Sequence, residues 1–317
     1  MIKLKDAFIL CKDAIFIIYI GYNLYSLSQL ILSEYCHQNL NLSSFKADSS
    51  WVVLSPIEKR IKEKIEKVGK ALKNWDISIY RGILTGYNDA FIIDGKTKDA
   101  LIAKSAKNAE IIRPILRGRD IKRYKVDFAD LWLLNIHNGT NSTPPININD
   151  YPEIKAHLDQ FYPALEKRQD KGITPYNLRS CIYTDDFSKQ KIVWGEISDK
   201  SKFALDNCGL YPEATTFFLI GEKLSYLLAI LNSKLGEWLF NQIGTTTGMG
   251  TNRWKKYKLE TLLVKVPSEQ EELEIVQLIE KITDNEAHTN EDVDKVNQLI
   301  YRVYDLTPEE ISFIDSL

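Results

Sequence analysis

The chain has 317 residues, of which 44% are hydrophobic and 26% are charged, a composition typical of a folded globular protein rather than a disordered or fibrous one. Four cysteines lie far apart and form no CxxC pair, which argues against a disulfide scaffold or a cysteine metal site and favours reduced thiols in the cytoplasm. The apolar segment at residues 14–22 is too short to span a membrane. A signal peptide is the weaker alternative there, because no clear small-residue cleavage site follows.

Charge is divided unevenly along the chain. Residues 267–317 contain 14 acidic and 3 basic residues. The whole chain has 43 acidic and 41 basic residues, so residues 1–266 carry 29 acidic against 38 basic ones. A basic body favours an anionic partner, and the acidic C-terminal segment indicates a different partner.

The first elements in chain order are helical by prediction. Residues 1–38 predict a helical docking segment. Residues 55–58 read S-P-I-E, which has the form of a capping box with proline at the first helical position. The apolar spacing that follows predicts an amphipathic helix of about five turns.

Two short apolar segments, 76–80 and 90–94, then predict strands joined by a turn. Two glycines in this turn allow it to present Arg81, Tyr87 and Asn88 outward. These residue types suit a nucleic acid, because Arg and Asn read base edges and Tyr stacks. An ordinary hairpin with solvated polar residues is the simpler alternative.

A strongly basic segment follows at residues 111–125, which read I-I-R-P-I-L-R-G-R-D-I-K-R-Y-K. A glycine interrupts the run and a tyrosine lies within it, so it is a better candidate for phosphate contacts than a plain basic face. A solvated surface is the equally weighted alternative. The candidate DNA-binding residues here are Arg117, Arg119, Lys122, Arg123 and Tyr124.

Residues 131–136 predict a strand, and residues 150–166 predict a capped helix. The segment 167–183 that follows is irregular, basic and aromatic. Segments of this kind on a rigid scaffold often carry binding residues. The candidates here are Arg168, Lys171, Tyr176, Asn177 and Arg179.

Strands at 191–197 and 214–220 precede a strongly apolar helix at 223–243. The run 244–258 then combines three glycines and several hydroxyl side chains with a tryptophan and a cluster of cations. Freed backbone N–H groups and cations suit a flexible loop that contacts DNA. The candidates here are Thr246, Thr247, Asn252, Arg253, Trp254 and Lys255.

The acidic C-terminal segment predicts three helices, two of them with capping signals at Ser268 and Thr307. The second helix is expected at residues 293–303. Apolar stripes on such helices usually pack on their own chain. At a terminus they can instead dock a partner subunit.

Together these motifs resemble the TaqI-like C-terminal specificity domain. Five segments carry the resemblance: Y-R-G-I-L-T-G-Y-N-D-A-F-I-I-D, I-I-R-P-I-L-R-G-R-D-I-K-R-Y, D-Y-P-E-I-K-A-H-L, L-E-K-R-Q-D-K-G-I-T-P-Y-N-L-R-S-C and A-I-L-N-S-K-L. In that family the domain is the target-recognition part of type IIG restriction–modification enzymes, fused to an N6-adenine DNA methyltransferase. The G-T-T-T run followed by V-P-S-E-Q-E-E-L also resembles the end of a recognition domain in type I specificity subunits. The resemblance covers residues 50–317.

The predicted elements and the resemblance together indicate a mixed α/β (α+β) recognition domain with a twisted sheet and flanking helices. We expect an N-terminal helical docking segment at residues 1–50, the DNA target-recognition domain at 51–266 and an acidic helical segment at 267–317. The resemblance implies double-stranded DNA and an adenine methyltransferase or endonuclease module as partners. It implies no membrane partner.

The candidate residues divide by the kind of DNA contact that each side chain suits. Clustered cations neutralise backbone charge without reading sequence, and forked or amide groups beside strands suit base edges. Tyr87 and Tyr176 could stack on bases, although a tyrosine in a turn more often packs. The phosphate candidates are Arg117, Arg119, Lys122, Arg123, Arg253 and Lys255. The base-edge candidates are Arg81, Asn88, Asn177 and Arg179.

The chain departs from the family in lacking an Asn-Pro-Pro-Tyr-type motif and a glycine-rich loop for S-adenosylmethionine. The nearest string, T-P-P-I at residues 143–146, has neither the Asn nor the aromatic residue that would hold a flipped adenine. We therefore expect no catalytic residues, no cofactor and no metal in this chain. It is either a stand-alone specificity subunit or a piece of a fused enzyme.

Two other functions compete with this interpretation. A metal-dependent nuclease would use the string Glu153-Ile154-Lys155 with Asp94 or Asp99 as a further carboxylate. Such strings arise by chance in charged helices, and an acid in a helix's first turn suits the dipole. A protein-interaction scaffold would explain the acidic segment but not the basic body.

Overall fold

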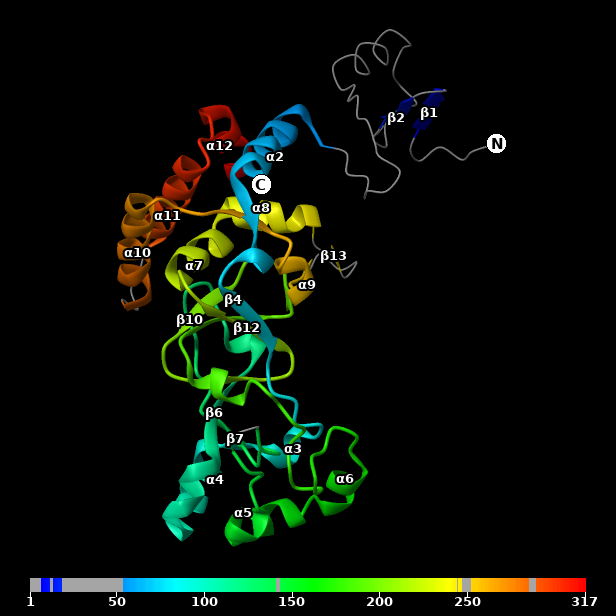
Figure 1. Cartoon of the computed structure of the whole chain (residues 1–317), viewed down its shortest axis with the longest axis vertical. Helices are drawn as coiled ribbons and strands as arrows, with labels where there is room; N and C mark the ends of the chain where they lie inside the picture. Colours follow the sequence, from blue (N-terminus) through cyan, green and yellow to red (C-terminus); the bar gives the residue numbers. More distant parts are fainter. Residues whose placement is uncertain are drawn as a thin grey trace, which may run out of the picture. The chain divides into compact units, whose positions relative to one another are not determined.

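The computed structural model describes residues 7–11, 14–18, 54–140, 143–243, 245–246, 252–284 and 289–317. The chain divides into two compact units, which we call the terminal unit (Met1–Lys67 with Asp305–Leu317) and the central unit (Val68–Tyr304). Figure 1 shows the elements of each unit in chain order. None of the helices in the described ranges is both long and apolar enough to cross a membrane.

The N-terminal part of the terminal unit contains a strand pair. Strands β1 (Ala7–Cys11) and β2 (Ala14–Ile18) are antiparallel. The helical prediction for residues 1–38 is therefore wrong at these strands, because β-branched and aromatic residues fit a pleated ribbon well. The rest of that predicted segment lies outside the described residues.

Helix α2 (Pro56–Val68) begins as predicted. The backbone N–H of Ser55 donates to the carboxylate of Glu58 (2.7 Å), and the N–H of Glu58 donates to the hydroxyl of Ser55 (3.3 Å). This reciprocal pair is a capping box, and it satisfies two of the donors that a helix leaves free at its start.

Helix α12 (Pro308–Asp315) is also capped as predicted, by Thr307. Its Glu310 is almost fully buried and accepts a hydrogen bond from Nζ of Lys64 in α2 (2.7 Å). Burial on its own raises the pKa of Glu310, but Lys64 and the cap of Thr307 outweigh burial and hold that pKa below its usual value.

The central unit contains two four-stranded sheets, and the first is fully antiparallel in the order β10–β8–β12–β4. Most of its side chains are buried, so its strands are almost continuously apolar. Lys191 and Asp206 form a buried ion pair across β8 and β10 (2.5 Å). The strands are β4 (Ile77–Arg81), β8 (Lys191–Gly195), β10 (Phe203–Asp206) and β12 (Thr216–Gly221).

The second sheet has the order β11–β6–β7–β5. Its pairs are antiparallel except for β11 with β6, which is parallel. The chain passes from the first sheet to the second after β4, returns to the first at β8, passes to the second again at β11 and returns to the first at β12. The strands are β5 (Ile92–Asp94), β6 (Ile112–Leu116), β7 (Leu131–Leu134) and β11 (Tyr211–Pro212).

The hairpin predicted from residues 76–94 is wrong, because its two strands lie in different sheets. Strand β4 pairs with β12, β5 pairs with β7, and the short helix α3 (Asn88–Phe91) replaces the start of the second predicted strand. Gly82 makes the crossing possible: a Cβ there would lie 2.0 Å from the carbonyl oxygen of Glu213. Its N–H donates to the carbonyl oxygen of Thr216 (2.9 Å), so the chain runs on along the β11–β12 segment.

On the first sheet, α7 (Leu224–Asn232) packs against β8 and β10, and α8 (Lys234–Ile243) follows it. The sequence predicted a single helix here. The chain breaks at Ser233, whose backbone is extended and whose hydroxyl donates to the carbonyl of Ile230 (2.7 Å) and accepts from the N–H of Gly236 (2.9 Å). The serine thus ends one helix and caps the next.

The helix predicted at residues 150–166 is also two helices, α5 (Pro152–Asp159) and α6 (Tyr162–Lys167). Pro163 lies in the first turn of α6 and cannot donate a backbone hydrogen bond to a continuing helix. Helix α4 (Gly95–Lys104) contacts α5 and strand β7, which completes the cover of the second sheet.

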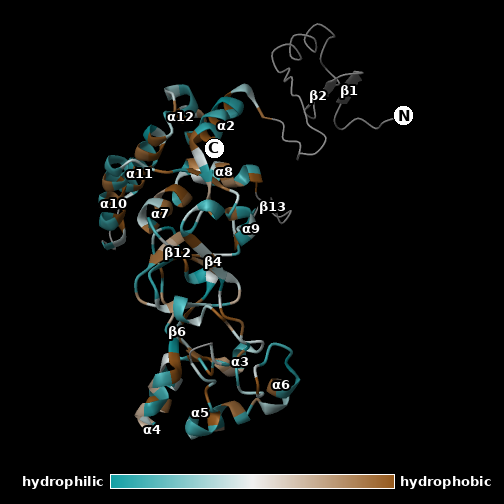
Figure 2. Ribbon diagram, in the orientation of Figure 1, coloured by the Kyte–Doolittle hydropathy of each residue, from teal (hydrophilic) through white to brown (hydrophobic). Residues whose placement is uncertain are grey.

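The acidic segment forms α10 (Glu269–Asp284) and α11 (Asn290–Val303), and both belong to the central unit before α12 begins. Helix α10 packs against α7 and α11 with buried Ile275 and Ile279, while Leu273 is 52% exposed. Figure 2 shows the hydrophobic and hydrophilic faces of these helices.

Smaller pairings complete the central unit. Strands β3 and β15 are antiparallel, and β9, β13 and β14 form a three-stranded sheet. The structure confirms the predicted mixed α/β fold with helices beside the sheets, although the strands form several sheets. The small strands are β3 (Gly69–Ala71), β9 (Ile197–Ser198), β13 (Thr245–Thr246), β14 (Asn252–Arg253) and β15 (Leu263–Lys265).

Candidate nucleic-acid interface

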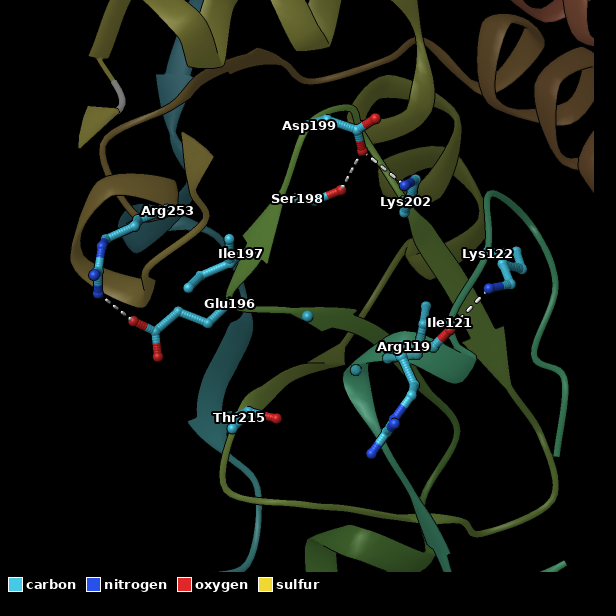
Figure 3. Close-up of a pocket in the computed structure, with 12 residues that line it drawn as sticks. Arg119, Ile121, Lys122, Glu196, Ile197, Ser198, Asp199, Lys202, Thr215 and Arg253 are labelled. Carbon is cyan, nitrogen blue, oxygen red and sulfur yellow. Dashed lines mark hydrogen bonds and ion pairs between the residues drawn. The ribbon is translucent and has the colours of Figure 1, made fainter. Parts of the chain in front are cut away.

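A hollow of about 760 Å³ opens in the central unit, where the turn after β6 meets the end of β8 (Figure 3). We call it the basic hollow. Its floor is formed by backbone. An added Cβ on Gly118 would lie 3.4 Å from the Cα of Gly195, so these two backbone segments are in contact with no side chains between them. The basic hollow is lined by Gly118, Arg119, Ile121, Lys122, Gly195, Glu196, Ile197, Ser198, Asp199, Lys202, Thr215 and Arg253.

Four cations and two carboxylates surround this floor. Arg253 pairs with Glu196 (3.3 Å) and Lys202 pairs with Asp199 (2.7 Å), as the dashed lines in Figure 3 show. The hydrogen bond from Lys202 is the largest of the effects that lower the pKa of Asp199. The two remaining cations of the hollow are Arg119 and Lys122.

Those two cations have no carboxylate partner among the described residues. Nζ of Lys122 donates to the backbone carbonyl of Arg119 (2.8 Å), which leaves two of its three N–H groups for other acceptors. The guanidinium of Arg119 projects into the basic hollow in Figure 3. Two cations without carboxylate partners beside two exchangeable ion pairs suit an incoming anion.

The structure brings together three of the predicted phosphate candidates, Arg119, Lys122 and Arg253. Arg253 lies 131 residues beyond Lys122 in the sequence. Lys255 lies beside them, with Nζ 3.8 Å from Glu196. Sequence reasoning missed the contributions of the β9–β10 turn, above all Lys202. Its only sequence signal is S-D-K-S-K, which reads as an ordinary solvated turn.

Two other predicted phosphate candidates are engaged within the chain. Arg117 donates from Nε and Nη2 to the carboxylate of Asp120 (2.7 and 2.9 Å), and this hydrogen bonding raises the pKa of Arg117. Arg123 donates to the backbone carbonyl of Asn232. Both arginines therefore hold the turn that carries Arg119 and Lys122.

Four of the predicted contact residues are buried and cannot touch a ligand in this conformation. Trp254 stacks on Phe240 with ring centroids 3.8 Å apart, and Tyr124 is 4% exposed. Arg168 and Asn177 lie inside the 167–183 segment. Because they are buried, the candidate interface excludes four predicted residues: Tyr124, Arg168, Asn177 and Trp254.

Arg168 sits in a cage of backbone carbonyls. Its guanidinium donates to the carbonyl oxygens of Thr85 and Asn177, of Asp170 (3.0 Å) and of Pro175 (3.1 Å). The side chain also lies over the ring of Phe91, 4.5 Å from its centroid. Burial lowers the pKa of Arg168 to about 10, which leaves it charged at neutral pH.

The Arg168 cage joins two turns with the same sequence pattern, T-G-Y-N at residues 85–88 and T-P-Y-N at 174–177. In the first, Thr85 Oγ1 accepts from the N–H of the following tyrosine (3.2 Å) and donates to the amide oxygen of Asn88 (2.5 Å). In the second, Thr174 makes the same two bonds at the same distances to Tyr176 and Asn177. We call these the twin turns.

The twin turns leave some predicted base-edge residues accessible. Asn88 is exposed, and the side chain of Arg179 is 63% exposed although it pairs with Asp170 (3.2 Å). Arg81 is exposed, with Nε donating to the carbonyl of Ala214 (2.6 Å), next to the rim of the basic hollow.

The tyrosines of the twin turns pack rather than stand free. Tyr87 lies beside Phe161 with ring centroids 6.2 Å apart. The hydroxyl of Tyr176 donates to Asp159, and its ring lies 5.7 Å from that of Tyr162. Both tyrosines therefore brace the α5–α6 junction.

Two of the remaining candidates have hydrogen-bond partners within the chain. Nζ of Lys171 donates to the carbonyl of Glu166 (2.6 Å), and Asn252 donates to the side chain of Asn241 (2.6 Å). Thr246 pairs with Asn252 in the β13–β14 ladder. Thr247 lies outside the described residues.

The carboxylates of the nuclease alternative have other partners. Asp94 caps α4 by accepting from the N–H of Thr97 (2.7 Å). Glu153 accepts from the side-chain amide of Asn108 (3.4 Å), and Asp99 pairs with Lys98 (2.9 Å). Within the described ranges, no group of three or more His, Cys, Asp or Glu side chains could hold a metal ion.

Part of the chain is similar to a known family. Residues 113–264 match the model of the TaqI-like C-terminal specificity domain. The matched residues include the whole basic hollow and the second of the twin turns. No curated protein sequence matches the chain.

Two solved structures are similar in fold. The type IIL restriction–modification enzyme MmeI, determined in complex with DNA, has a TM-score of 0.57 at 12% identity and covers 78% of this chain. The type IIG restriction endonuclease BpuSI has a TM-score of 0.48 at 13% identity and covers 81% of this chain. The chain corresponds to 37% of the length of MmeI and 34% of that of BpuSI.

Proposed function

We propose that the chain is a sequence-specific DNA recognition module of a restriction–modification system. It positions an N6-adenine methyltransferase or endonuclease, in another chain or another part of the same protein, on a DNA target. The observation that carries this proposal is the specificity-domain match over residues 113–264, which encloses the basic hollow. A specificity module needs affinity for the DNA backbone and a way to read base edges.

Backbone affinity comes from the basic hollow. Arg119 and Lys122 meet phosphates directly, while phosphates displace Glu196 from Arg253 and Asp199 from Lys202. The exchange costs little, because exposed ion pairs in water contribute at most about 1 kcal/mol. Binding then releases counterions from the DNA and weakens steeply with salt.

Base reading comes from the accessible residues of the turns, Arg81, Asn88 and Arg179. Their forked or amide groups match the donor and acceptor pattern of purine edges in the major groove. The Arg168 cage and the twin turns hold these groups on a fixed backbone, and a preorganised reader loses less freedom on binding. Arg117 and Arg123 position the basic hollow from behind.

The chain carries out no methyl transfer or cleavage by itself in this proposal. A catalytic module docks on the acidic helices, where Leu273 is half exposed between Glu272 and Glu274 of α10. Removing residues 267–317 would uncover α7, which packs on α10, so a point change is the cleaner test. Leu273→Asp should abolish co-purification with the catalytic module and leave DNA affinity unchanged; retained co-purification would refute this docking site.

DNA binding is tested by fluorescence anisotropy with a pool of 30-bp random-sequence duplexes at several salt concentrations. The wild-type chain should bind with an affinity that falls linearly on a log–log plot of salt. Arg119→Ala and Lys122→Ala should each reduce the steepness of that line by about 0.9, the value for one phosphate contact.

Lys104→Ala is the matched control, because Lys104 is an exposed lysine at the end of α4, outside the basic hollow. It should leave the salt dependence unchanged. Equal effects of Lys104→Ala and Lys122→Ala would show that the chain attracts DNA only through its overall charge. Absence of wild-type binding at 50 mM salt would refute the proposed function.

A further inference from the structure

An apolar side chain stands at the tip of the loop that follows α6. Ile173 is 67% exposed, between Gly172 and Thr174. A single exposed apolar residue is common on soluble proteins, and what sets Ile173 apart is the fixed backbone that holds it outward.

The backbone under Ile173 is fixed. Lys171 and Leu178 form an antiparallel bridge, and the N–H of Gly172 donates to the carbonyl of Asn177 (2.9 Å). The N–H of Ile173 itself donates to the side-chain oxygen of Asn138 (2.7 Å). The segment is a closed hairpin loop with Ile173 at its end.

Asn138 and Gly172 lock this loop further. The amide nitrogen of Asn138 donates to the hydroxyl of Ser180 (2.7 Å), so one side chain ties both arms of the loop. A Cβ on Gly172 would lie 2.4 Å from the Asn138 oxygen and 2.6 Å from the carbonyl of Leu178. From inside, Arg168 holds the carbonyls of two residues of the same loop.

The surroundings of Ile173 are basic and polar. Lys171 and Arg179 flank the tip, and Asp170 is occupied by its ion pair with Arg179. In the view of Figure 1, α6, which leads into this loop, lies on the same side of the central unit as α9 (Lys256–Leu259), whereas α10 lies on the other side.

We propose that Ile173 is a wedge that inserts between base steps of the bound duplex. This inference rests on the proposed DNA-binding function. Ile and other apolar residues inserted in this way partly unstack a step and kink the DNA toward its major groove. A rigid loop beside a lysine suits that role, because Lys171 holds a phosphate next to the opened step while the wedge keeps its position.

A second isoleucine in the segment provides a matched control. Ile182 is 89% exposed, so it is at least as accessible as Ile173. It precedes Asp185, which is exposed, and Asp186, which pairs with Lys189 (2.7 Å). Carboxylates beside it disfavour close approach of phosphates, so we expect Ile182 to remain outside the DNA.

The test compares two 30-bp duplexes of one sequence, one fully paired and one with a central A·A mismatch, by fluorescence anisotropy. A mismatched step is already partly unstacked, so a wedge should bind it about tenfold more tightly. Ile173→Ser should lose this preference and keep the salt dependence of the wild type. Ile173→Leu should retain it, and Ile182→Ser should behave as wild type.

Each outcome has a distinct meaning. If the wild-type chain binds neither duplex, the proposed function fails together with the wedge. If it binds both in a salt-dependent way but Ile173→Ser keeps the mismatch preference, only the wedge is overturned. Loss of the preference in Ile182→Ser instead would also overturn it. If Ile173→Ser keeps the mismatch preference but no longer co-purifies with the catalytic module, the isoleucine contacts protein rather than DNA.

Discussion

The basic hollow and the Arg168 cage are both arginine-containing sites of the central unit, yet they use the same side chain in opposite ways. In the cage, every bond of the Arg168 guanidinium goes to backbone carbonyls of its own chain. In the hollow, Arg119 has no carboxylate partner among the described residues and faces open space. The comparison shows that an arginine in a basic segment is a DNA-contact candidate when its guanidinium remains accessible, and not when backbone carbonyls of its own chain enclose it.

The largest expected effect comes from breaking the cage. Arg168→Ala removes four bonds to carbonyls, three of which lie in the twin turns. Of these four carbonyls, that of Asn177 still accepts from the N–H of Gly172. We expect a loss of about 3 kcal/mol or more in the free energy of unfolding, measured by urea denaturation. Arg119→Ala is the control from the hollow and should change stability by less than about 0.5 kcal/mol.

Arg168→Lys sharpens the same test. Lysine keeps the charge but lacks the planar fork that reaches both turns at once. It should recover only part of the lost stability. Equal stability of Arg168→Lys and wild type would mean that charge alone, and not the fork, holds the two turns together.

The sequence predicts much of this fold but little of this distinction. Ser55, Thr307 and the apolar strand segments carry local signals, because capping and strand formation depend on neighbouring residues. Gly82 and Ser233 show the limit: whether they turn, cross or break an element depends on contacts with distant segments. Sequence reasoning therefore joined two strands of different sheets and fused two pairs of helices.

The same limit applies to the candidate site. The segment R-G-R-D-I-K-R-Y contains four cations, Arg117, Arg119, Lys122 and Arg123. Its composition alone does not distinguish the cations that bond within the chain from those that are available to a ligand. Only the positions of Asp120 and of the Asn232 carbonyl separate two internal braces from two available cations. The T-x-Y-N repeat was readable in the sequence, but its meaning required the carbonyl cage between the two copies.

An intermediate effect is expected at the twin turns. Thr174→Val removes the donor to the side-chain oxygen of Asn177, which is buried and would lose its partner. Thr85→Val does the same to Asn88, which is exposed and can turn to water. We expect a loss of about 1–3 kcal/mol for Thr174→Val and about 0.5–1 kcal/mol for Thr85→Val in urea denaturation.

Serine substitutions provide the control for the twin turns, because they keep both hydroxyl bonds. Thr174→Ser and Thr85→Ser should remain close to wild type. A larger loss from Thr85→Val than from Thr174→Val would contradict the explanation by burial. It would mean that the first turn contributes more than the second to the free energy of unfolding.

The smallest expected effect concerns the anions of the basic hollow. Oε1 of Glu196 lies 3.3 Å from Arg253 and 3.8 Å from Lys255, so it competes with phosphate for two cations. Glu196→Gln removes that competition, and since ion pairs at a protein surface contribute about 0.2–1 kcal/mol, DNA affinity should rise about 1.4- to fivefold at low salt. Glu222→Gln, an exposed carboxylate outside the hollow, removes the same charge and should raise affinity less. Equal gains from both changes, measured by anisotropy on the random duplex pool, would mean that net charge rather than the hollow attracts the DNA. A gain confined to Glu196→Gln would place the phosphates beside Arg253 and Lys255. These cations can exchange a carboxylate for a phosphate, whereas Arg168 is enclosed by carbonyls of its own chain.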